Sequence, residues 1–121
     1  MKIRSILAIA GLLLLSTAAF AQVIEVGEFA ATPTNEGYSL QGGKGERTFI
    51  DVIQFDKGFS VPPKVIVSLA GYDATAGTDN TVRVQATATK ITKAGFTLRV
   101  KTWGDGRVGS VWGNWIAVGV K

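Results

Sequence analysis

The stretch Thr81–Thr89, TVRVQATAT, alternates strictly between apolar and polar side chains. The apolar side chains fall at the even positions and the polar ones, Arg83 among them, at the odd positions. A period of two residues is typical of an antiparallel strand with one buried face and one solvated face. The sequence therefore predicts a strand over 81–89 with Arg83 on the outward face.

Other strands are predicted on both sides of this stretch, at 23–26, 48–55, 64–70, 95–100 and 112–120. Residues 30–45 and 71–80 are rich in turn-forming residues and are predicted to be loops. No segment after Ala21 has a helical period. These patterns predict an all-β chain, a six-stranded antiparallel β-sandwich forming a single domain after a signal peptide. Its expected divisions are residues 1–21, a signal peptide; 22–47, an N-terminal arm with a glycine-rich loop; and 48–121, the sandwich.

The first residues have the pattern of a secretory signal peptide. A basic head, Met1–Arg4, precedes an apolar run, Ile6–Leu15, and the small-x-small sequence Ala19–Ala21 follows. We expect cleavage near Ala21 and a secreted product, extracellular or periplasmic. A membrane anchor is the alternative, but it needs about twenty apolar residues and the run breaks at Ser16. We therefore expect no membrane insertion.

The composition excludes several classes of chemistry. The chain has no histidine and no cysteine, which removes the usual ligands for zinc and the usual catalytic triads. We expect no metal site, no cofactor and no enzymatic activity, although a carboxylate pair of the glycosidase kind stays open. Calcium binding by the loop 73–79 is less favoured than a solvated loop. The 13 basic residues are scattered, which argues against nucleic acid as a partner.

The stretch Lys101–Val108, KTWGDGRV, is the candidate binding loop. Trp103 continues the outward parity of the preceding strand, and Arg83 is outward on its own strand, so the two can meet if these strands are neighbours. Aromatic rings and planar guanidinium groups suit sugars, which combine apolar C–H faces with many hydroxyls. The alternatives are a solubilising role for Arg83, a core or subunit contact for Trp103, and a turn-capping role for Asp105. Trp112 and Trp115 are predicted to be core or subunit contacts.

The region from Ile53 to Gly119 resembles the H-type lectin domain. The likeness is carried by the segments FSVPPKV at 59–65, VRV at 82–84, TKAGF at 92–96, TWGD at 102–105 and WIA at 115–117. The resemblance implies a trimer of six-stranded sandwiches with a shallow pocket for galactose or N-acetylgalactosamine. It implies sugar contacts by Arg83 and Trp103.

The resemblance further implies an acid from the loop before the first domain strand. Lys44 stands at that position here, and Glu46 lies close by, so both join Asp105 as candidate pocket residues. Gly104 and Gly109 stand where the family often has a polar side chain and a tyrosine, which implies a smaller pocket.

Two functions follow from these expectations. The first is a secreted lectin whose weak single sites gain about 10²–10⁴ in avidity through a homotrimer. The alternative is a non-catalytic structural or assembly module with a vestigial sugar pocket.

Overall fold

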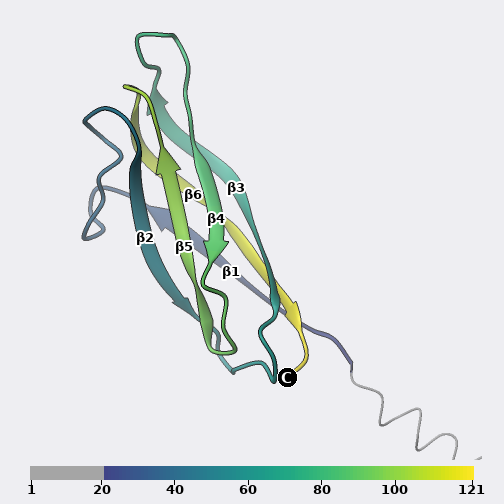
Figure 1. The fold of residues 1–121 in the computed structure, drawn as a ribbon. Coiled ribbons are helices and arrows are strands. Elements are labelled where there is room, and N and C mark those ends of the chain that lie inside the picture. Colours follow the sequence, from purple (N-terminus) through teal and green to yellow (C-terminus); the bar gives the residue numbers. More distant parts are fainter. Residues whose placement is uncertain (1–20) are drawn as a thin grey trace, which may run out of the picture.

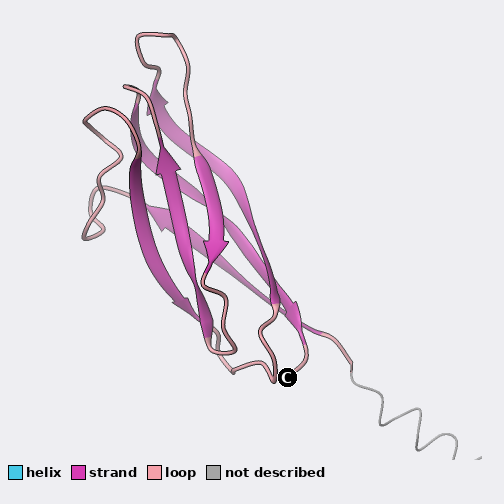
Figure 2. Ribbon diagram, in the orientation of Figure 1, coloured by secondary structure: helices cyan, strands magenta, loops and turns pink. Residues whose placement is uncertain are grey.

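The computed structural model describes residues 21–121. Residues 1–20, on which nearly all of the predicted signal peptide falls, lie outside this range. The described chain contains strands and loops but no helix (Figure 2). Accordingly, residues 21–121 include no helix of the length and apolarity needed to cross a membrane.

The strands form two three-stranded sheets that face each other (Figure 1). One sheet has the order β1-β6-β3 and the other β2-β5-β4, and every neighbouring pair is antiparallel. The strands are β1 (Val23–Ala31), β2 (Arg47–Gln54), β3 (Lys64–Thr75), β4 (Gln85–Thr89), β5 (Gly95–Thr102) and β6 (Arg107–Gly119). The predicted all-β, six-stranded antiparallel sandwich is confirmed. β1 lies within the predicted N-terminal arm and pairs with β6 along its whole length.

An aromatic cluster fills the space between the sheets. The ring centroids of Phe96 on β5 and Trp115 on β6 lie 5.4 Å apart at a steep angle, and Phe55 lies 5.9 Å from each. Edge-to-face contacts of this kind add to the stabilisation from burial alone. Glycine makes room for these rings: a Cβ at Gly27 would lie 2.4 Å from the ring of Trp115. The cluster therefore joins the two sheets.

Several predicted strand boundaries were wrong. β1 continues to Ala31 rather than ending at residue 26. β4 begins at Gln85 rather than at residue 81, and before it the carbonyl of Arg83 accepts a hydrogen bond from the Thr102 hydroxyl (2.7 Å). β3 continues to Thr75 through the predicted loop 71–80, across two register shifts. β6 begins at Arg107 rather than at residue 112. The register shifts of β3 and the glycine at position 109 of β6 interrupt the alternation that marks a strand.

The outer face of the β1-β6-β3 sheet is largely apolar. Val26, Ile116 and Ile66 form one row across its three strands. These side chains, with Ile24 and Trp112, are all exposed. An exposed apolar sheet face of this kind is a common site of protein association.

Three loops gather at one end of the sandwich (Figure 1). They are the glycine-rich loop before β2, the loop between β3 and β4, and the turn between β5 and β6. The Gly45 amide donates to the Gly104 carbonyl (2.9 Å) and so ties the first loop to the third. This end of the molecule carries the candidate binding residues.

Replacing Phe96 by alanine should lower the free energy of unfolding by about 3–5 kcal/mol, because the side chain is only 2% exposed and a cavity would remain between the sheets. Urea unfolding followed by tryptophan fluorescence measures the loss. The matched control is Val52→Ala, on the outer face of β2, which is 68% exposed and should change stability by less than about 1 kcal/mol. Equal losses in the two variants would contradict the assignment of the core.

Candidate functional site

The turn between β5 and β6 presents Trp103 to solvent. β5 ends at Thr102, whose side chain is buried, and the next residue continues the outward parity of the strand. The Trp103 side chain is 41% exposed. Gly104 follows with φ of 85°, a left-handed conformation that glycine adopts without steric cost. The ring is therefore held at the strand end as an exposed aromatic surface.

Arg47, which the sequence analysis did not single out, fastens the turn to the glycine-rich loop. Its Nη2 donates to the Gly106 carbonyl (2.8 Å), and its Nη1 donates to the carbonyls of Gly42 (2.8 Å) and Gly43. Its Nε is buried and has no hydrogen-bond partner among the described residues. One guanidinium thus fixes the positions of two loops relative to each other.

Glu46 lies beside a pair of cations on the outer face of the β2-β5-β4 sheet. Its Oε1 accepts a hydrogen bond from Arg99 Nη2 (2.9 Å) and lies 4.0 Å from Lys101 Nζ. The Lys101 ammonium in turn lies 5.4 Å from the centroid of the Trp103 ring. Glu46, Lys101 and Trp103 therefore form one continuous surface. Arg99 and Lys101 alternate with buried residues in the same way as Trp103. The strand alternation in the sequence could therefore have predicted that both point outward.

Arg83 lies against Gly104 of the same turn. Its Nη2 donates to Asp79 Oδ2 (2.6 Å) from the β3-β4 loop. The hydrogen bond from Arg83 lowers the pKa of the Asp79 carboxyl, and the same bond raises the pKa of Arg83. A Cβ at Gly104 would stand 3.0 Å from Arg83 Nη1, so the glycine lets the guanidinium lie against the turn. Arg83 is thus brought next to the turn that carries Trp103.

Asp105 ties the β5-β6 turn to the β3-β4 loop. Its Oδ1 accepts a hydrogen bond from the Thr78 amide (2.9 Å), and the bonds from Thr78 lower the pKa of this carboxyl. Its packing against Gly77 leaves no room for a Cβ there, which would lie 2.1 Å from Oδ1. Asp105 therefore connects two loops, whereas the sequence analysis had weighed a cap within its own turn.

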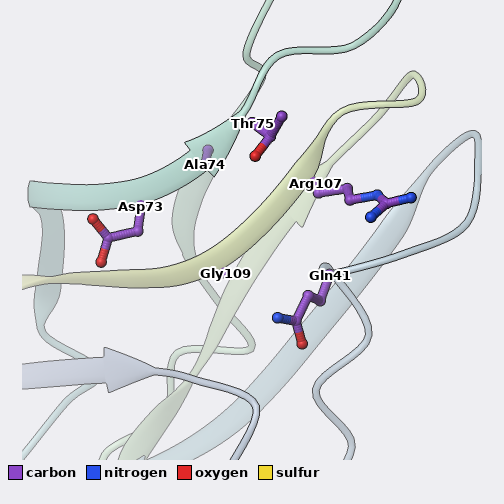
Figure 3. A pocket seen from close by; sticks show the side chains of 6 residues that line it. All are labelled: Gln41, Asp73, Ala74, Thr75, Arg107 and Gly109. Atoms are coloured by element: carbon purple, nitrogen blue, oxygen red, sulfur yellow. The ribbon is translucent and has the colours of Figure 1, made fainter.

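Lys44 and Arg107 flank a hollow of about 540 Å³ that Asp105 also lines. A second hollow of about 570 Å³ shares Arg107 and opens at the end of the β1-β6-β3 sheet. It is polar: the Asp73 carboxylate accepts a hydrogen bond from the Ser110 hydroxyl (2.9 Å). Its lining comes from β3, β6 and the loop before β2 (Figure 3), and comprises Gln41, Asp73, Ala74, Thr75, Arg107 and Gly109.

The five predicted site residues all lie at this end of the sandwich, in two groups. Glu46 and Trp103 share the outer sheet face through Lys101, whereas Lys44 and Asp105 line the neighbouring hollow. Arg83 contacts the turn between the two groups.

The other two tryptophans lie elsewhere. Trp115 is buried in the core, and Trp112 is 40% exposed on the outer face of the opposite sheet. An exposed ring among guanidinium, ammonium and carboxylate groups can stack on a sugar and bind its hydroxyls. Residues 21–121 hold no group of three acid side chains placed to bind a metal.

The comparisons with known proteins place the chain in a family. The family model of the H-type lectin domain matches residues 50–118. The chain belongs to the H-type lectin domain family, which defines a class of carbohydrate-binding proteins rather than of enzymes.

Among curated proteins, a Fuscovulum blasticum protein described as ATP synthase subunits region ORF 7 is 33% identical over 84 residues, covering 69% of this chain and 71% of that one. Two solved structures of discoidin II from Dictyostelium discoideum are similar, each at 26% identity. Their TM-scores are 0.72 and 0.73, over 83% and 84% of this chain. The match spans 38% of the discoidin II chain.

The Asp105–Thr78 contact should weaken in acid. Because the folded-state pKa of Asp105 lies below its ordinary value of 3.8, the ionised contact contributes stability above about pH 4 and loses it as the pH falls through the folded-state pKa. The chemical shift of the Thr78 amide proton, followed by NMR from about pH 6 to about pH 2, reports this titration. In the control variant Asp105→Asn the pH-dependent shift should vanish; a shift that persists would contradict the assignment.

Proposed function

We propose that this protein is a secreted lectin that binds galactose-type glycans at the surface formed by Trp103, Lys101, Glu46 and Arg83. The main support for this proposal is the exposed ring of Trp103. The Lys101 ammonium lies 5.4 Å from the ring centroid, and Glu46 lies next to that ammonium. A pyranose stacked on the ring would bury its C–H face and present its hydroxyls to the charged groups. Membership of the H-type lectin domain family supports this function.

Replacing Trp103 by alanine should weaken binding of a galactoside by about tenfold or more, since the stacking area would be lost. Isothermal titration with a monovalent galactoside measures the change. Trp112→Ala is a closely matched control, because that side chain is 40% exposed, against 41% for Trp103, but lies on the opposite sheet. Binding should survive in the control, and a wild type that binds no sugar would rule out the lectin function.

The same proposal includes a homotrimer with several sites on one particle. The apolar outer face of the β1-β6-β3 sheet supports association, because Val26, Ile66 and Ile116 form an exposed row across it. The described chain has no disulfide to replace the stabilisation that such an interface provides. Multivalent sites of this kind raise avidity for glycan-rich surfaces and suit a role in cell adhesion.

Ile116→Lys should convert the oligomer to a monomer, because it places a charge in the centre of the apolar row. Size-exclusion chromatography with light scattering measures the mass. Val52→Lys places the same charge on the outer face of the other sheet and should leave the mass unchanged. An oligomer that dissociates with Val52→Lys but not with Ile116→Lys would place the interface on the other sheet.

A structural or assembly module is the second candidate function. It is favoured by the ion pairs already present in the site, since Arg83 is engaged by Asp79 and Glu46 by Arg99. An intact oligomer that binds no glycan on an array would support this candidate.

A further inference from the structure

We propose that the preferred ligands of this site are anionic sugars, which carry a carboxylate or a sulfate ester, and that Lys101 binds the anionic group. This inference rests on the proposed function, because it assumes that Trp103 is the stacking surface for the sugar. It concerns the charge of the sugar. That charge is independent of whether the sugar is of the galactose type.

The Lys101 ammonium lies over the stacking surface. It lies 5.4 Å from the centroid of the Trp103 ring, so a sugar that stacks on that ring beside the ammonium would place a substituent against it. Its nearest acid is Glu46, at 4.0 Å, which is too long for a hydrogen bond. The ammonium therefore keeps donors available for a ligand.

The acids around the site are already engaged. Glu46 accepts its hydrogen bond from Arg99 (2.9 Å), not from Lys101, so one carboxylate faces two cations. Asp79 is paired with Arg83 at 2.6 Å. Of the two cations that share Glu46, Lys101 is the one that lies over the Trp103 ring.

The neighbouring hollow adds positive charge on the other side of the turn. Lys44 and Arg107 both line it, and neither has a salt-bridge partner within residues 21–121. The one carboxylate there, that of Asp105, accepts the Thr78 amide hydrogen. A ligand at this end of the sandwich therefore meets a positive potential, which favours an anionic substituent over a hydroxyl.

The test compares three ligands on the full-length mature protein by isothermal titration: methyl galactoside, methyl galacturonide and a galactoside sulfate ester. We expect the two anionic sugars to bind about three- to tenfold more tightly than the neutral one. The preference should shrink in about 0.5 M salt, because exposed charges are screened. Sodium sulfate serves as a fourth ligand and should bind far more weakly than the sulfated sugar.

Two lysine variants assign the effect to a residue. Lys101→Gln should abolish the preference, so that the anionic sugars and methyl galactoside bind this variant with affinities within about twofold of one another. Lys64→Gln makes the same change in net charge at the first residue of β3 on the opposite sheet and should keep the preference. An equal loss in both variants would overturn the assignment to Lys101, since it would show an effect of net charge alone.

The remaining outcomes separate this inference from the proposed function. Equal or tighter binding of the neutral galactoside would overturn the inference and leave the lectin function standing. Failure of all three sugars to bind would overturn both. Sodium sulfate that binds as tightly as the sulfated sugar would show a simple anion site and would also overturn the inference.

Discussion

The arrangement of the three loops at the end of the sandwich that carries the candidate site depends on the guanidinium of Arg47. It is held at the start of β2 by the ladder with β5 and donates to carbonyls in two separate loops, those of Gly42 and Gly106 among them. Without the Arg47 guanidinium, these backbone carbonyls would need other hydrogen-bond donors or water. The two loops would then no longer be held at a fixed distance from each other. The position of Trp103 relative to Glu46 therefore depends on the bonds of Arg47 to the two loops that carry them.

In the rest of the sandwich, the alternation of apolar and polar side chains along each strand determines which side chains enter the core. Phe96, Leu98 and Val100 point inward from β5 at a spacing of two residues and are almost completely buried. The regular strands could be predicted because a two-residue period leaves a direct trace in the sequence. The end of β3 could not, because its register shifts interrupt that period while the backbone pairing with β6 continues. The residues 107–111 of β6 were missed for a similar reason, since Gly109 gives no side chain by which a face can be recognised.

The site was predictable to the extent that it lies on regular strands. Parity placed Trp103 outward, and the structure has it exposed. The ion pair of Arg83 with Asp79 depends on how the β3-β4 loop folds back, which no spacing rule gives. Arg47 was harder still, because its partners are backbone carbonyls, and any residue type supplies these. The sequence therefore predicted the exposed side chains of the site. It did not predict the side chains that hold the loops in place.

The chain positions of the proposed site residues have a consequence for when the site can form during folding. Residues 46, 83 and 103 come together only after β5 has paired with both β2 and β4, and the Tyr38 hydroxyl must also reach the Val108 carbonyl, 70 positions away. No single hairpin contains the site. The proposed site would therefore form only when the last strands have paired, late in the folding of the chain.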